Sequence, residues 1–224
     1  MYGSEGFSIY DIILWAQGLG VSVGVFILSM TLGLLLGVAI GLIRYYQIAF
    51  LGKTLMMISE FLKNSPIIVQ LFLVYFGIPA VTGIDMTPIE AAVWTLSANT
   101  AAFIAVIIIS SISSIEPRQL EAARSFALSE FVILRKIIFP QAFSVSIPLL
   151  VGLAINQLQV TSLISVIGVY DLTRVGDIVN QRTFEPFIVW PIIGATYFIL
   201  AKLLAHLGTR LERRFSQHKI MSEL

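Results

Sequence analysis

Five long runs of apolar residues constrain this chain more than any other feature of its sequence. A helix needs about 20 apolar residues to cross the roughly 30 Å hydrocarbon core of a bilayer. The runs cover residues 21–43, 65–84, 88–112, 143–167 and 187–207. An all-α fold follows, because hydrocarbon cannot satisfy backbone polar groups and a helix satisfies its own. We therefore predict a polytopic membrane helix bundle of about five transmembrane spans, with a short interfacial helix at residues 50–62 before the second span.

The composition places the chain in the membrane class and excludes several others. Only 12% of its 224 residues are charged, against roughly 25% in soluble domains. The net charge of +1 and the lack of a basic cluster argue against nucleic-acid binding. There are no cysteines, so disulfides and thiolate metal sites are excluded. We find no internal repeat and predict one domain over residues 1–224.

The positive charges predict the orientation of the spans. No Lys or Arg precedes Arg44, so the first run lacks the basic flank of a signal peptide and is expected to remain as a span. Lys and Arg gather after the first and third runs and in the C-terminal tail, and positive segments stay in the cytoplasm. We predict an N-terminus outside, a C-terminus in the cytoplasm and a cytoplasmic loop at residues 113–141.

Three glycines in the first run, Gly33, Gly37 and Gly41, recur every fourth residue. This spacing puts them on one helix face, where small residues let another helix approach closely. We interpret the stripe as ordinary helix packing, which indicates a bundle and says nothing about a substrate.

The loop at residues 113–141 is predicted to form two short helices at the membrane surface. Pro117 suits the first turn of one helix, and Ser129 is placed to cap the second. Pro140 is expected to separate the second short helix from the fourth span. Such a loop offers a partner protein a surface to bind.

At this loop the sequence resembles the membrane subunits of binding-protein-dependent ABC importers, in particular the polar amino acid subfamily. The motif residues are Glu121, Ala122, Ala123, Ala127 and Pro140. The resemblance continues in residues 60–79, 134–142, 161–174 and 211–215. It implies that the loop is a coupling segment that docks on an ATP-hydrolysing subunit. Glu121 would make a charge-assisted contact or anchor the start of a helix, and the two alanines would permit close approach.

The resemblance also implies a set of partners and a location. These are a dimer of ABC ATPase subunits that binds ATP and Mg²⁺, a second permease subunit and an extracytoplasmic amino-acid-binding protein. All would be assembled with lipid in the bacterial cytoplasmic (inner) membrane. This chain itself has no phosphate-binding loop and no catalytic cluster, so we predict no enzyme activity, no cofactor and no metal in it.

The chain departs from the family pattern in informative places. Ala127 stands where the family has Gly, so we expect a different turn between the loop helices. Val106, Ile109, Gln159 and Val160 replace four charges that the subfamily usually carries at membrane depth. Intramembrane charge by default marks function. Its absence favours a heterodimer in which a different permease subunit contributes the substrate site.

Neutral polar residues inside the spans are the candidates for a substrate pathway. They are Asn99, Thr100, Asn156, Gln159, Thr161 and Ser162. Amide and hydroxyl groups would meet the ammonium and carboxylate of an amino acid. The alternative is that they only hydrogen-bond between helices and hold the bundle together.

Two further questions stay open at this level. Residues 168–186 would face outward, and their charges either contact a binding protein or pair with one another. The charges are Asp171, Arg174, Asp177, Arg182 and Glu185. The alternative function is a self-sufficient channel or secondary transporter for small polar solutes, although such proteins usually keep acidic residues deep in a span and none is found here.

Overall fold

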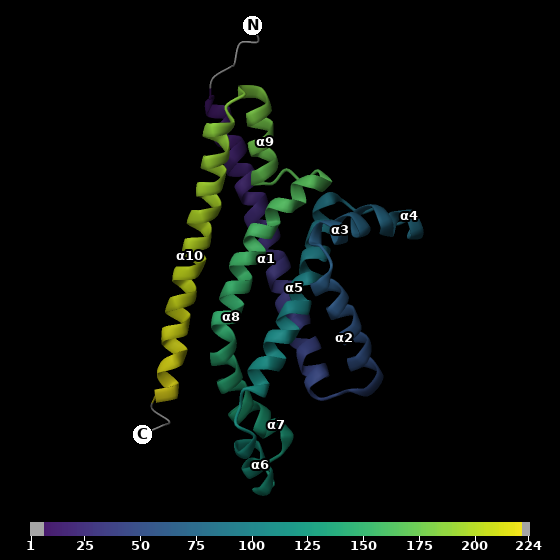
Figure 1. Ribbon diagram of the computed structural model, residues 1–224, viewed down its shortest axis with the longest axis vertical. Helices are drawn as coiled ribbons and strands as arrows, with labels where there is room; N and C mark the ends of the chain where they lie inside the picture. The colour runs from purple at the N-terminus through teal and green to yellow at the C-terminus, as the bar shows by residue number, and fades with distance from the viewer. Residues whose placement is uncertain (1–6, 221–224) are drawn as a thin grey trace.

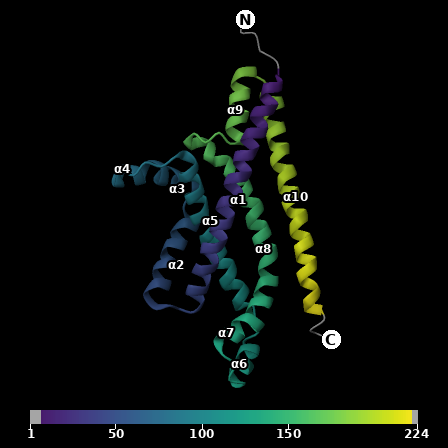
Figure 2. The same cartoon turned by 180° about the vertical axis from the view of Figure 1, so that it is seen from behind.

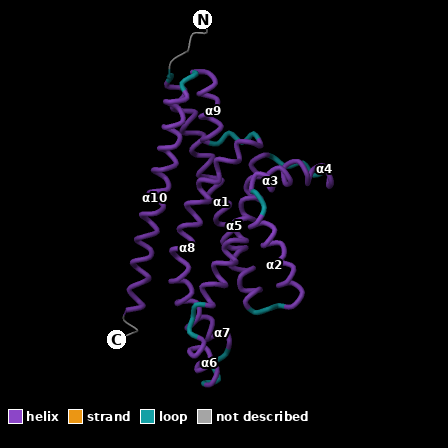
Figure 3. Tube along the Cα trace, viewed as in Figure 1, coloured by secondary structure: helices purple, strands orange, loops and turns teal. Residues whose placement is uncertain are grey.

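The computed structural model describes residues 7–220, and long helices that lie side by side dominate that part of the chain (Figures 1 and 3). The four longest are α1 (Ile9–Tyr45), α5 (Pro88–Ser113), α8 (Phe139–Val160) and α10 (Pro186–Ile220). Each contains enough consecutive apolar residues to cross a bilayer. These helices match the first, third, fourth and fifth predicted spans, so the predicted fold class is confirmed.

Helix α1 begins twelve residues earlier than the predicted span at residue 21, and its first turn explains why. Ser8 caps the helix while Asp11 accepts a hydrogen bond from the Ser8 backbone N–H at 2.8 Å. Arg182 neutralises the carboxylate of Asp11 by donating to both of its oxygens. This reciprocal cap and the ion pair extend the helix over polar residues that hydropathy alone does not assign to a span.

The glycine stripe of α1 packs against α5, as predicted. A Cβ built on Gly37 would lie 2.6 Å from the Cβ of Ile104, and one on Gly33 would lie 2.7 Å from Thr100. Real Cβ atoms do not approach so closely, so these positions require glycine for the two backbones to stay in contact. The pair α1–α5 forms the centre of the bundle.

The second predicted span is wrong as a straight helix. Helix α2 (Ala49–Asn64) runs back beside α5, and the chain then bends by 113° (Figures 1 and 2). The bend leads into α3 (Ile67–Phe72), a π-helical turn and α4 (Ile78–Thr82), which point away from the other helices. The predicted interfacial helix and the predicted span are therefore the two arms of one bent helix pair, which together are long and apolar enough to cross a membrane. The break lies at Pro66, which has no N–H to continue a helix.

The predicted loop helices are present and lie beyond the end of the bundle (Figure 1). They are α6 (Pro117–Ser125) and α7 (Glu130–Ile133). The prediction that Pro140 separates α7 from the fourth span is wrong, because a π-helical turn, Leu134–Ile138, joins α7 directly to α8. Its hydrogen bond from the Phe139 N–H reaches back five residues to the Leu134 carbonyl, and this wider turn accommodates the proline.

The opposite end of the molecule holds α9 (Leu172–Thr183), reached from α8 through a 3₁₀ segment, Thr161–Ile167. Asp171 caps α9 by accepting from the backbone N–H groups of Thr173 and Arg174. The apolar face of α9 is buried between α1 and α10 in a cluster of Leu172, Val175, Val179, Val189 and Ile193. In the rest of the article the two ends are called the α6–α7 end and the α9 end.

Candidate functional site

Helix α6 carries three of the five predicted coupling residues, and they differ in burial. Ala123 is buried, and it packs with Ile133, Ile138 and Ile112 in one apolar cluster. Glu121 and Ala122 are exposed. The small buried residue therefore lets α6 lie close to the base of the bundle, while the acidic residue is left for a partner.

The end of α6 explains the position at which the family has glycine. Ala127 has φ +52°, in the left-handed region that glycine favours. The Leu128 N–H donates to the Ala123 carbonyl at 3.3 Å, and the Ala127 N–H donates to the Arg124 carbonyl at 2.9 Å. This pair of bonds is a Schellman motif. Alanine therefore adopts the conformation suited to glycine, and the different turn that we expected is not formed.

Helix α7 starts two residues after that turn, and polar contacts fix it to α6. The Ser129 hydroxyl accepts from the Val132 N–H at 3.4 Å, so the predicted cap is confirmed. Arg124 and Glu130 form a salt bridge at 3.0 Å across the turn. Gln141 donates to Gln119 at 2.9 Å and ties α6 to the start of α8. The two short helices thus have a defined geometry without any partner.

The last residues of α1 reach the same region. Tyr45 joins the apolar cluster beneath α6. Burial, followed by the negative charge of Glu130 and the neighbouring Tyr45, raises the pKa of Tyr46, while Arg124 opposes that rise. The charges of the salt bridge between α6 and α7 therefore act on the end of α1. A movement of the loop would change this interaction with α1.

Large apolar side chains flank the motif. Phe126 is 80% exposed and Phe131 is 68% exposed. Both lie beyond the apolar runs, where water and not lipid would contact them. Exposed aromatic residues next to Glu121 are typical of a protein–protein interface.

Asn99, a predicted pathway residue, supports the break in the second span instead. Its amide donates to the Leu62 carbonyl at 2.9 Å and to the side-chain oxygen of Gln70 at 3.2 Å. Gln70 donates to the same carbonyl at 2.7 Å. In a continuous helix the N–H of residue 66 would serve the Leu62 carbonyl, and residue 66 is proline. Two side chains thus satisfy a carbonyl that Pro66 leaves without its partner.

Two other predicted pathway residues are completely buried. Thr100 lies against Gly33 of α1, and its hydroxyl has no hydrogen-bond partner in the described part of the chain. Thr161 donates to the Leu158 carbonyl at 2.6 Å, where α8 passes into the 3₁₀ segment. Neither side chain reaches the surface in this conformation. Their role in a pathway stays a prediction.

The remaining candidates lie together on the accessible side of α8 and its continuation. Asn156 and Gln159 are exposed, and Ser162 is half-buried. The predicted shared face of Asn156 and Gln159 is present. Between them Gln157 points inward and donates to Ser29 of α1 at 3.2 Å. That contact was missed, because a run of amides gives no sign of which member is buried.

The charged residues of the α9 end are used largely inside the chain. Arg174 pairs with Asp177 at 3.1 Å, and Arg182 binds Asp11. Asp171 is fully buried, and this burial raises the pKa of its carboxyl group. The backbone N–H groups of Arg174 and Thr173 donate to the carboxylate and oppose that rise. Internal pairing therefore accounts for most of these charges. Glu185 is exposed.

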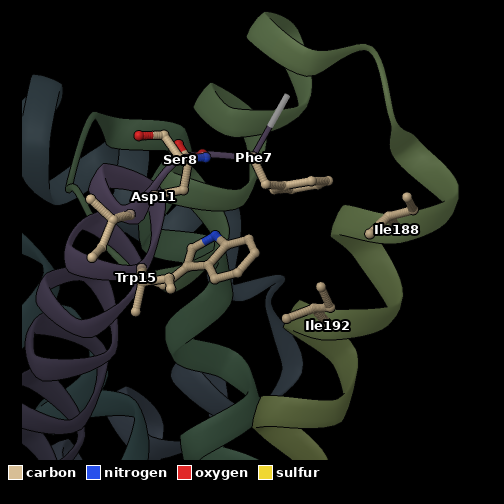
Figure 4. Close-up of a pocket in the computed structure, with 8 residues that line it drawn as sticks. Phe7, Ser8, Asp11, Trp15, Ile188 and Ile192 are labelled. Atoms are coloured by element: carbon tan, nitrogen blue, oxygen red, sulfur yellow. The ribbon is translucent and has the colours of Figure 1, made fainter. Parts of the chain in front are cut away.

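A hollow of about 410 Å³ lies near that end, between the first turns of α1 and the start of α10 (Figure 4). Its lining is mostly apolar, with Phe7, Trp15, Ile188 and Ile192 pointing into it. None of the predicted pathway residues lines it. Its polar groups are few. Ser8 and Asp11 already serve the cap and the ion pair, and the buried indole N–H of Trp15 has no hydrogen-bond partner among the described residues.

Comparison with known proteins identifies the family. Residues 18–217 match the model of the binding-protein-dependent transport system inner membrane component, and the chain belongs to this family. It is therefore a multi-pass membrane protein. The probable amino-acid ABC transporter permease protein YckA of Bacillus subtilis is 31% identical over 90% of this chain and 89% of its own. The glutamine transport system permease protein GlnP of Escherichia coli is 30% identical over 90% and 92%.

Solved structures agree with this assignment. The chain is similar to one from a crystal structure of an amino acid ABC transporter with histidines, with a TM-score of 0.84 and 31% identity over 93% of this chain and 99% of the other. A chain of the inward-facing MetNI methionine ABC transporter has a TM-score of 0.80 at 20% identity, which shows a shared fold alone.

Proposed function

We propose that this chain is the membrane-spanning permease subunit of an ATP-driven importer for polar amino acids. The family assignment supports the class of protein, and permeases named for glutamine and cystine transport that share about a third of its residues support the substrate class. The single observation that carries the proposal is α6, a braced helix outside the bundle that exposes Glu121 in a segment that also exposes Phe126 and Phe131. ATP and Mg²⁺ bind to a separate ATPase subunit in this scheme, since this chain has no phosphate-binding loop.

The orientation in this proposal puts the α6–α7 end in the cytoplasm. The N-terminus and α9 then face outward. The distribution of Lys and Arg supports this choice, because Arg118, Arg124, Arg135 and Lys136 all belong to the α6–α7 end. The C-terminal tail lies toward the same end (Figure 1).

Coupling follows from the geometry of α6. Closure of two ATPase subunits on ATP would move the docked α6, and the salt bridge, the glutamine pair and the buried Ala123 would transmit that displacement to α1 and α8. The bundle would then rock between outward-open and inward-open states around the pathway. We assign Glu121 and Ala122 to the docking surface, and Ala123, Ala127 and Pro140 to the support of that surface.

The pathway in this proposal runs along the accessible side of α8. Asn156, Gln159 and Ser162 are its polar lining, whereas Asn99 supports the bend at Pro66. Thr100 and Thr161 would join only if rearrangement of α5 or of the 3₁₀ segment exposed them. A second permease subunit closes the other side of the pathway. We favour a different chain over a second copy, because Gln159 and its neighbours bring no charge for the ends of an amino acid.

The outer face would receive substrate from an extracytoplasmic binding protein. Glu185 is its candidate contact, because the other charges of the α9 end are largely paired within the chain. The alternative of a self-sufficient channel or secondary transporter predicts uptake that persists without ATP. Uptake in proteoliposomes with and without internal ATP separates the two.

The decisive experiment is to test the docking surface directly. Glu121→Lys reverses the charge on the exposed face of α6 and should abolish both co-purification of the ATPase and ATP-dependent uptake. Asp85→Lys is the matched control, since it makes the same charge reversal in the exposed loop before α5. Normal membrane insertion with loss of the ATPase in the first variant alone would support the proposal. Retention of the ATPase by Glu121→Lys would refute it.

A further inference from the structure

A second hollow, of about 300 Å³, lies where α1 ends and α2 begins. It is on the α6–α7 side of the bundle (Figure 1), but none of the coupling or pathway residues lines it. Its lining is both cationic and apolar and consists of Arg44, Gln47, Gly52, Lys53, Met56 and Ile109.

The two cations of this hollow form no ion pair with any residue in the part of the chain that the structure describes. The Nη1 atom of Arg44 is buried and has no hydrogen-bond partner there. Lys53 is exposed and takes part in none of the ion pairs between described residues. Glu60, further along α2, forms a salt bridge with Lys63 at 2.9 Å, and its charge also interacts with that of Arg44 without forming an ion pair. A buried donor without an acceptor is unfavourable, so the hollow is suited to a ligand with anionic oxygens.

The backbone around the hollow adds to its positive character. Helix α1 ends in a Schellman motif, with the Ile48 N–H on the Ile43 carbonyl at 3.2 Å and Gln47 at φ +50°. Helix α2 then starts at once, and its N-cap Ile48 has no side-chain acceptor for the first-turn N–H groups. The start of a 16-residue helix carries a partial positive charge, and it lies next to Arg44 and Lys53.

The surroundings favour a lipid over a soluble anion. Phe50 is 85% exposed, Leu51 48% and Met57 65%. These side chains lie along α2 near the hollow, and α2 is one arm of the bent, apolar helix pair, so we expect them to face acyl chains. We propose that the hollow binds the phosphate of an anionic phospholipid headgroup, with Arg44 and Lys53 as its cationic contacts and Met56 against the glycerol and upper acyl carbons. Two cations that form no ion pair among the described residues favour a headgroup with net negative charge over a zwitterionic one.

The test is a titration of the full-length protein with phosphatidylglycerol, read by native mass spectrometry, for wild type, Arg44→Gln, Lys53→Gln and Arg210→Gln. Arg210 is the matched control, an exposed arginine on α10 outside the hollow. We expect each of the first two variants to bind about fivefold more weakly, as for the loss of one cation beside an anionic lipid, and the control to bind as wild type does. Lys53 is exposed, so its variant answers the question even if Arg44→Gln does not fold.

Other outcomes reject the proposal. Equal binding by all four proteins would show that the hollow is not the site. Displacement of phosphatidylglycerol by excess inorganic phosphate would show a soluble-anion site, and phosphatidylcholine binding as tightly as phosphatidylglycerol would remove the requirement for net negative charge.

Discussion

Pro66 and Pro140 each follow a helix, yet the helix direction changes sharply at Pro66 and continues through Pro140. At Pro66 the preceding residue is extended, with φ −109° and ψ 147°, and the helix axis turns by 113°. At Pro140 a π-helical turn carries the helix through. The difference lies in the neighbours. Near Pro66, the side chains of Asn99 and Gln70 donate hydrogen bonds to the Leu62 carbonyl from outside α2. Before Pro140, the π-helical turn satisfies its carbonyl groups by rearranging its own backbone hydrogen bonds.

The largest expected effect on stability comes from replacing a side chain that supports the bend at Pro66. Gln70→Leu removes three hydrogen bonds to the chain around Pro66 and leaves Asn99 with one partner fewer. Because the site is buried, we expect a loss of about 2–3 kcal/mol in unfolding free energy. Thermal or denaturant unfolding in detergent measures it. Gln141→Leu, at an exposed glutamine, should cost far less, and equal losses would contradict the assigned role of Gln70.

Replacing each proline by alanine sharpens the comparison. Pro66→Ala restores an N–H that can serve the Leu62 carbonyl, so the 113° bend should open toward a straighter span. Pro140→Ala should leave its helix direction unchanged. Distances between spin labels on α2 and α4, and between labels on α7 and α8, report the two angles. A bend that is unchanged in Pro66→Ala would show that the side chains alone impose it.

A smaller effect, a gain in stability, is expected at the turn between α6 and α7. Ala127→Gly relieves a left-handed alanine at the end of α6, and the relief is about 1 kcal/mol for a residue in that region, partly offset by the greater freedom of glycine in the unfolded chain. A higher melting temperature with unchanged ATPase co-purification would agree with this. Ala122→Gly, at an exposed position inside the same helix, is the control and should destabilise instead.

The smallest effect is expected for the salt bridge across that turn. Arg124→Gln removes an exposed pair, and such pairs contribute little to stability. Its melting temperature should match that of wild type, whereas coupling of ATP hydrolysis to transport should fall if the pair holds α6 against α7. A clear loss of stability with normal coupling would assign the pair a purely structural role.

The periodicity of the sequence was enough to predict most of the bundle. Runs of apolar residues identified α1, α5, α8 and α10, and the glycine spacing identified the face on which α1 packs. The Glu-Ala-Ala motif and the cap at Ser129 placed the two loop helices. These features depend on local composition or on spacing along one helix, which a sequence displays directly.

The partners of polar side chains were not predictable in the same way. Asn99 was assigned to a pathway and serves a carbonyl 37 positions earlier in the chain. Gln157 reaches across to α1, while Asn156 and Gln159 beside it remain accessible. Asn and Gln look alike in any apolar run, so only the position of the neighbouring helix decides which of them bonds within the bundle.

By itself, the sequence determined that this chain enters a membrane as several helices and carries a loop for a partner, because hydrophobicity and the coupling motif are properties of consecutive residues. The tertiary structure alone decided that the second span is bent, that Asp11 is neutralised by Arg182, and that the Nη1 atom of Arg44 is buried without a hydrogen-bond partner among the described residues. Each of these depends on groups far apart in the chain, and they come together only when the helices pack.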